Sequence, residues 1–234
     1  MQDIAASFSL AFSLIAGGDP ELWQIVILSL EVSLASTLLA CLFGLPLGTL
    51  VATRRFPGWR FVVVVMNALL GLPSVVVGLV VYLLLSRAGP LGSAGILFTP
   101  SAIVVAQTLL VLPIVAALAR QFAEGAWTEY REQLISLGVS PSRAVPTILW
   151  DLRLTLFTVV LAGFGRAASE VGAVMVVGGN IDGVTRVMTT AIALETSKGD
   201  LPLALGLGMI LLAIVLILNA AAFALREWSA RHHG

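Results

Sequence analysis

The chain has 234 residues, of which 59% are hydrophobic and only 11% are charged. Because soluble domains contain about 25% charged residues, this composition argues against a water-soluble enzyme and indicates a membrane protein. The charges of the thirteen basic and thirteen acidic side chains cancel, and a chain without a net positive charge is a poor partner for nucleic acid. The single cysteine, Cys41, excludes an intrachain disulfide and cysteine-based metal motifs.

The N-terminal segment, residues 1–20, lacks the basic start of a signal peptide and is too short to span a bilayer. Its large apolar residues recur at helical spacing, at Ile4, Phe8, Ala11, Phe12 and Ile15. This pattern predicts a helix that lies in the membrane interface. A disordered leader is the alternative.

Long apolar runs follow this segment, and a transmembrane helix needs about 20 apolar residues. Four runs contain no charged residue, and a fifth is interrupted only by Arg166 and Glu170. A Gly-Pro-Leu-Gly turn at 89–92 separates the second run from the third. We therefore predict five helices, at residues 22–52, 59–86, 100–121, 153–177 and 201–226. The predicted fold is all-α, a single polytopic membrane domain over residues 1–234.

The basic residues predict the orientation of these helices. If the first helix begins outside, nine basic residues lie on the cytoplasmic side, and three lie outside, namely Arg87, Arg186 and Lys198. This asymmetry follows the positive-inside rule. An external N-terminus and a cytoplasmic C-terminus also agree with an odd number of spans. Residues 178–200 then form an external loop, and residues 121–152 form the one long cytoplasmic loop.

The cytoplasmic loop carries a helical pattern of its own. Apolar residues at spacings of three and four form one stripe, made of Trp127, Tyr130, Leu134 and Leu137. Gly138 is expected to end this helix, because glycine adopts the left-handed conformation easily. Ser140 and Pro141 are expected to begin a second short helix. The stripe either folds against the membrane or forms a docking ridge for a partner protein.

A seven-residue segment of this loop, Glu132 to Gly138, resembles the EAA motif of ABC-importer permeases when taken together with Ile148. That motif consists of Glu-Ala-Ala, three residues, Gly, nine residues and Ile-x-Leu-Pro. Glu132, Gly138 and Ile148 match it in register. The sequence departs from the motif at the two alanines, replaced by Gln133 and Leu134, and at the final Leu-Pro, replaced by Trp150-Asp151.

The resemblance continues outside the loop and covers nearly the whole chain after about residue 19. Residues 165–173 and 178–181 are similar to the corresponding helix of molybdate, tungstate and sulfate permeases. Residues 71–79, 86–107 and 185–200 resemble the tungstate branch most. The chain is therefore identified as a member of this family, with tungstate as the expected cargo and molybdate or sulfate as the alternatives.

The resemblance implies a set of partners and a location. Such permeases form a homodimer in a bacterial or archaeal plasma membrane, together with cytoplasmic ATP-binding subunits and an external oxyanion-binding protein. This chain has no Gly-x-x-x-x-Gly-Lys-Ser/Thr phosphate loop, so ATP and Mg²⁺ belong to a separate chain. We expect the permease to bind no cofactor or metal and to be no enzyme by itself. The family assigns residues 124–150 to coupling with the ATPase.

Arg166 and Glu170 are the oppositely charged residues expected inside the membrane. Four residues apart on one helix, they can pair and so lessen the cost of burial. Either the pair lies on the translocation pathway, where Arg166 attracts the anion, or it ties helices together at the dimer interface. The other candidates for the pathway are Ser169, Pro73 and Ser74.

Two other classes of protein deserve comparison. An intramembrane protease needs a buried Ser–His pair or two intramembrane aspartates, but both histidines, His232 and His233, lie in the C-terminal tail. A stand-alone channel or secondary transporter has no need of a cytoplasmic helix–Gly–helix loop, and the five predicted spans contain no evident internal repeat. Both alternatives are therefore disfavoured.

Overall fold

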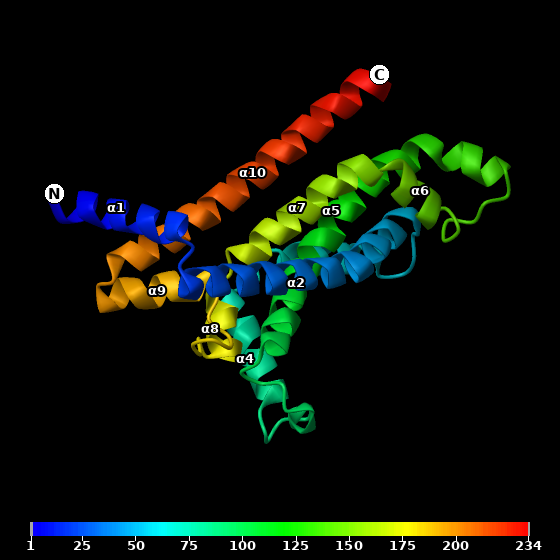
Figure 1. Cartoon of the computed structure of the whole chain (residues 1–234). Helices are drawn as coiled ribbons and strands as arrows, with labels where there is room; N and C mark the ends of the chain where they lie inside the picture. The colour runs from blue at the N-terminus through cyan, green and yellow to red at the C-terminus, as the bar shows by residue number, and fades with distance from the viewer. Residues whose placement is uncertain (1, 234) are drawn as a thin grey trace. The chain divides into compact units, whose positions relative to one another are not determined.

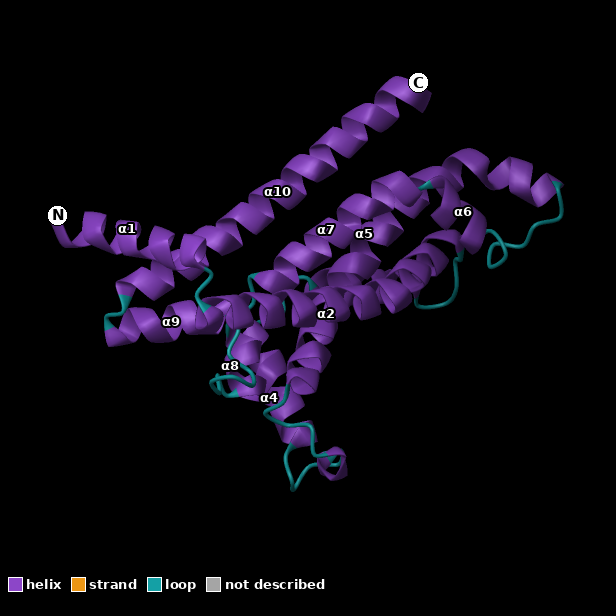
Figure 2. Cartoon of the chain, viewed as in Figure 1, coloured by secondary structure: helices purple, strands orange, loops and turns teal. Residues whose placement is uncertain are grey.

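The structure is a computed structural model that describes the backbone of residues 2–233 and the side chains of residues 6–224 and Glu227. Within these residues every regular element is helical, with ten α-helices and one short 3₁₀ helix (Figure 2). The predicted all-α fold is therefore confirmed. The side chains of His232 and His233 lie outside the described residues.

Three helices are long and apolar enough to span a membrane, namely α2 (Pro20–Thr53), α5 (Pro100–Ser136) and α10 (Leu201–His233). Two bent pairs also qualify, each counted as one span. In the first, α3 (Trp59–Leu69) and α4 (Ser74–Leu85) meet at 101°, and in the second, α6 (Val145–Asp151) and α7 (Arg153–Ala168) meet at 84°. These up to five spans match the predicted number, and the chain is a membrane protein.

Four of the five predicted helices differ from the structure, and the one predicted at 201–226 differs only in its end, which lies at His233. The helix expected at 59–86 breaks between Leu69 and Ser74, because Pro73 has no amide hydrogen to continue a helix. The helix expected at 153–177 ends at Ala168, and a separate short helix, α8 (Gly172–Gly178), follows it. The helix expected at 100–121 instead continues to Ser136. Hydropathy marks where a helix leaves the apolar layer, whereas helix propensity decides where it ends.

The chain divides into two compact units. Unit 1 contains residues 1–35, 73–107 and 167–217, and unit 2 contains residues 36–72, 108–166 and 218–234. Three of the boundaries between these units lie inside the continuous helices α2, α5 and α10, which are labelled and coloured by residue number in Figure 1. The other two lie near helix breaks, before Pro73 and after Arg166.

The core of unit 1 joins α2, α10 and a helix that the sequence analysis missed, α9 (Met188–Lys198). Its buried residues are Leu22, Ile25, Val26, Met188, Ala191 and Leu207. The Ser29 hydroxyl accepts the amide hydrogen of Met188 at 2.7 Å, which fixes the start of α9 on α2. The predicted external loop at 178–200 is therefore largely folded, and Arg186 within it contacts Asp182 at 3.1 Å and Glu21 at 3.6 Å.

The N-terminal helix α1 (Gln2–Gly17) is present, as predicted. Ala11 is fully buried, and a β-carbon on Gly206 of α10 would lie 3.7 Å from its carbonyl oxygen. Phe8 and Phe12 on the same helix are exposed. The helix is too short to span a bilayer, and its location in the membrane interface stays a prediction.

The core of unit 2 depends on close helix contacts at small residues. A β-carbon on Gly44 of α2 would lie 2.9 Å from Cγ1 of Val115 on α5, and one on Gly163 of α7 would lie 3.0 Å from Cγ1 of Val111. Glycines therefore let α2 and α7 both approach α5 closely. Cys41 is buried on α2, a few residues before Gly44.

Candidate functional site

The C-terminal end of α5 forms the predicted glycine corner. The amide of Gly138 donates to the Ile135 carbonyl at 2.9 Å, and the amide of Val139 donates to the Leu134 carbonyl at 2.9 Å. This is the Schellman arrangement, which requires a left-handed residue, and Gly138 has a φ of +76°. The prediction that Gly138 ends the helix is confirmed.

The second helix of the loop begins later than predicted. Residues 141–144 form turns, in which the Arg143 amide donates to the Ser140 carbonyl at 2.9 Å, and α6 starts only at Val145. The proline in the first turn of this helix is therefore Pro146 and not Pro141. The sequence did not distinguish them, because the first turn of a helix accepts any proline: amides there have no partner within the helix. The helix–Gly–helix order itself is confirmed.

The apolar stripe of the loop faces inward. Trp127 is 8% exposed and Ile148 of α6 is 1% exposed, and both belong to one buried cluster with Ala52 of α2. Tyr130 and Leu134 pack against this cluster and are partly buried. The alternative that the stripe forms an outward docking ridge is therefore wrong at Trp127, because α6 of the same chain covers this residue. Leu137 alone of the stripe is fully exposed.

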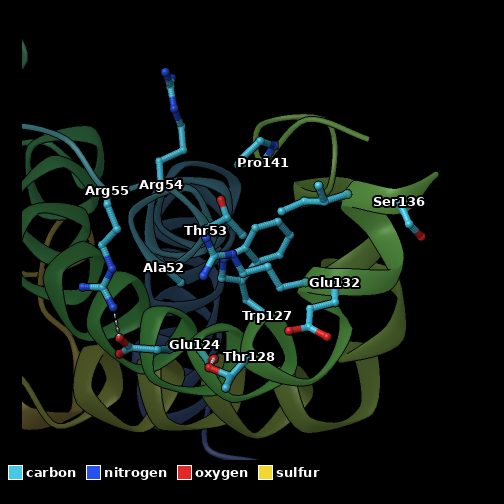
Figure 3. Close-up of a pocket in the computed structure, with 12 residues that line it drawn as sticks. Ala52, Thr53, Arg54, Arg55, Glu124, Trp127, Thr128, Glu132, Ser136 and Pro141 are labelled. Carbon is cyan, nitrogen blue, oxygen red and sulfur yellow. Dashed lines mark hydrogen bonds and ion pairs between the residues drawn. The ribbon is translucent and has the colours of Figure 1, made fainter. Parts of the chain in front are cut away.

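Polar residues face outward from this scaffold and line a groove of about 890 Å³. One wall comes from α5, with Arg131, Glu132 and Ser136, and the other comes from the end of α2 and the following turn, with Arg54 and Arg55. Figure 3 shows Arg54 and Arg55 on one side and Glu132 and Ser136 on the other. Glu132 is exposed, so the acidic residue matched to the EAA motif is open to a partner.

An ion-pair cluster that the sequence analysis missed closes one end of the groove. The two carboxylate oxygens of Glu124 contact Arg55 at 2.9 Å and Arg120 at 2.6 Å. The guanidinium of Arg55 also lies 3.5 Å from the ring centroid of Trp59, whose indole N–H donates to the Val51 carbonyl at 2.7 Å. Of these contacts, the sequence could have indicated only the ion pair between Arg120 and Glu124, because these two residues lie one helical turn apart.

A second electrostatic feature joins the two helices of the loop. The carboxylate of Asp151 on α6, followed by that of Glu129 on α5, raises the pKa of Tyr130 above its ordinary value of 10.0. A hydrogen bond between the Tyr130 phenol and Asp151 acts in the same direction. The phenol is therefore neutral and links α5 to the residue at the end of α6.

The predicted intramembrane pair is not carried by one helix. Arg166 lies in the last turn of α7, whereas Glu170 lies in the break between α7 and α8. Glu170 is 3% exposed, and its Oε1 accepts the Ala173 amide hydrogen at 3.1 Å, so it satisfies the start of α8. The argument from helical i, i+4 spacing is therefore wrong. Because the two residues belong to different units, their pairing stays a prediction.

The other candidate pathway residues lie near helix breaks. Pro73 precedes α4 and is exposed, Ser74 begins α4 and is half-buried, and Ser169 follows α7 and is exposed. A β-carbon on Gly172 would lie 2.8 Å from the Ser74 hydroxyl oxygen. In unit 1 the starts of α4 and α8 therefore lie together, and Figure 1 shows the two helices side by side.

Comparison with known proteins gives several relatives over nearly the whole chain. A tungstate uptake system permease protein of Peptoclostridium acidaminophilum is 41% identical over 227 residues, which cover 97% of this chain and 100% of that protein. A molybdenum transport system permease protein of Escherichia coli K12 is 31% identical, covering 91% of this chain and 95% of that protein. A sulfate transport system permease protein of Synechococcus elongatus is 27% identical, covering 87% and 76%. No family model matches the chain.

Proposed function

Since the chain belongs to the family of ABC-importer permeases that includes the tungstate, molybdate and sulfate permeases, we propose that it is the membrane subunit through which tungstate enters the cell. The choice of anion is supported by the difference in identity, 41% to the tungstate permease against 31% to the molybdenum permease. Molybdate or sulfate is the alternative cargo, since these anions share the charge and tetrahedral shape of tungstate.

Two copies of the chain form the pathway in this proposal. Two cytoplasmic ATPase subunits bind ATP and Mg²⁺, and an external binding protein delivers the anion. The assembly lies in a bacterial or archaeal plasma membrane, with the N-terminus outside and the C-terminus in the cytoplasm. The nine-to-three distribution of basic residues supports this orientation.

The main support for the proposal is the packing of the two helices in the cytoplasmic loop. Trp127 and Ile148 hold α6 against the extended end of α5, so the two helices form one packed element. The exposed Glu132 and the turn at Gly138 lie on the surface of this packed element, where an ATPase subunit can bind them. A pull on this surface moves α5 directly, because the helix continues without a break into the membrane.

The residues near the helix breaks are the proposed pathway candidates. Arg166 at the end of α7 can attract an anion, and Pro73, Ser74 and Ser169 accompany the breaks. Because the Glu170 carboxylate accepts a backbone hydrogen bond at the start of α8, we assign Glu170 to the structure of that helix start. Arg166 is then the candidate for attracting the anion. The alternative is that both residues serve assembly alone. Uptake by Arg166→Met importers that assemble normally separates these roles, because only an anion-attracting arginine affects uptake after assembly.

The coupling assignment is tested by Glu132→Arg and Gly138→Pro in importers produced together with the ATPase and the binding protein. Both variants should still fold and insert but lose most tungstate uptake. Glu132→Arg reverses an exposed charge, and Gly138→Pro displaces the turn, because proline cannot adopt the φ of +76° that Gly138 has. Gln121→Arg is the matched control, because it adds an exposed charge on the same helix, outside the groove and before the coupling residues 124–150. Normal ATPase association and full uptake in both variants would overturn the assignment. Uptake of molybdate or sulfate but not tungstate would overturn only the choice of cargo.

A further inference from the structure

The turn between α2 and α3 forms a basic and aromatic hollow that transport does not explain. The hollow has a volume of about 530 Å³ and is lined by Arg55, Phe56, Gly58, Trp59 and Arg60. None of these lining residues is acidic. The turn joins two helices of predicted spans, so the hollow lies where a bilayer meets water.

The two arginines of the hollow differ in their partners. Arg55 is bound to Glu124 and stacked on Trp59, so its position is fixed. Arg60 is exposed and forms no ion pair with any side chain that the structure describes. The hollow therefore offers one held guanidinium and one available guanidinium, and guanidinium groups match phosphate oxygens well.

An apolar surface begins directly beside the basic one. In the part of the chain that the structure describes, α3 has no buried residue, and its exposed apolar side chains include Phe61 at 71% and Val64 at 63%. Arg60 and Val64 are one helical turn apart and therefore share a face of α3. Charged and apolar groups are thus arranged in the order of a phospholipid headgroup and its acyl chains.

The hollow is also held in shape by interactions of its own. The indole N–H of Trp59 donates to the Val51 carbonyl, and the ring carries the Arg55 guanidinium. Gly58 has a φ of +84°, which sets the turn that brings Trp59 back toward α2. These contacts fix the hollow without any contribution from Arg60.

We propose that this hollow binds the phosphate of an anionic phospholipid headgroup between Arg55 and Arg60, with the acyl chains along Phe61 and Val64. A phosphate monoester in solution shares the headgroup chemistry but gains nothing from the apolar face of α3. The proposal rests on the membrane insertion of the chain and is independent of the transported anion and of orientation.

Native mass spectrometry of the full chain in a neutral detergent tests the proposal with phosphatidylglycerol and phosphatidylcholine. The wild type should prefer phosphatidylglycerol, and Arg60→Gln should bind it roughly fivefold more weakly. Arg60→Lys should recover part of the loss, because it keeps the charge but not the planar guanidinium. Arg54→Gln is the matched control, since Arg54 also carries an exposed charge but lines the neighbouring groove and points away from Glu124 (Figure 3).

Three outcomes would overturn the proposal. These are equal binding of the two lipids, an equal loss in Arg54→Gln and Arg60→Gln, and displacement of the lipid by millimolar glycerol phosphate, which would assign the site to a soluble phosphate. Because lipid binding is measured on the chain alone, a failure here leaves the tungstate proposal untouched. A failure of tungstate uptake likewise leaves this measurement untouched.

Discussion

The contact between α2 and α5 makes a strong prediction about Gly48. A β-carbon there would lie 3.0 Å from the carbonyl carbon of Ala116 and 3.0 Å from Cβ of Ala119, and closer still to the Ala116 carbonyl oxygen. Gly44, one turn earlier, meets the side chain of Val115. A side chain can rotate away, but the backbone of Ala116 cannot move without moving α5.

We expect Gly48→Ala to lower the free energy of unfolding by about 2 kcal/mol. Overpacking in a core costs about 1–3 kcal/mol, and contact with backbone atoms favours the upper end of that range. Alanine regains up to about 1 kcal/mol through its higher helix propensity. The net loss of about 2 kcal/mol corresponds to a roughly 30-fold decrease in the folding equilibrium constant.

The measurement is a titration of the purified chain from mild detergent into dodecyl sulfate, followed by the fluorescence of its five tryptophans. Gly165→Ala on α7 is the matched control, because a β-carbon there meets nothing within 4 Å. This control should be unchanged or gain up to about 1 kcal/mol. If Gly48→Ala and Gly165→Ala unfold at the same midpoint, the close backbone contact does not exist.

Two further predictions concern buried and coupled acids. Glu170→Leu should lower the free energy of unfolding by about 1–3 kcal/mol, because it leaves the Ala173 amide unpaired. Glu170→Gln should lower it less, because the glutamine side chain keeps an acceptor for this amide. The same dodecyl sulfate titration measures both variants, and equal losses would contradict the contact between Glu170 and Ala173. Asp151→Asn should lower the pKa of Tyr130, measured by tyrosinate absorbance in a Tyr82→Phe background. Because the folded-state pKa of Tyr130 is raised, its contribution to the free energy of unfolding should be complete below about pH 10 and be lost as the pH rises through the raised pKa. An unchanged pKa of Tyr130 in Asp151→Asn would exclude the interaction between these two side chains.

The spans themselves follow closely from the sequence. Helices predicted to begin at residues 22, 100, 153 and 201 begin at Pro20, Pro100, Arg153 and Leu201. Charged or turn-forming residues flank these helices, so composition alone locates the edges of the apolar layer. Gly138 was also predictable, because only a residue that tolerates positive φ closes a Schellman turn at low cost.

The breaks and the buried contacts did not follow from the sequence. Pro73 indicated a kink, but nothing in the sequence indicated that α4 packs against α8. The break before α8 contains no proline, and hydropathy does not report that the Glu170 carboxylate accepts the Ala173 amide hydrogen at the start of that helix. Periodicity placed Trp127 on an apolar stripe, but it could not reveal that the covering surface is α6 of the same chain.

The burial of Cys41 makes the chain a convenient subject for thiol chemistry. It is the only cysteine in the sequence, and α2 holds it inside the chain at 8% exposure. A membrane-impermeant maleimide should therefore find no reactive native thiol on either side of the membrane. Cysteines introduced at the exposed Ser13 and Ser142 would each report the side on which they lie, without replacement of a residue that packs in the core.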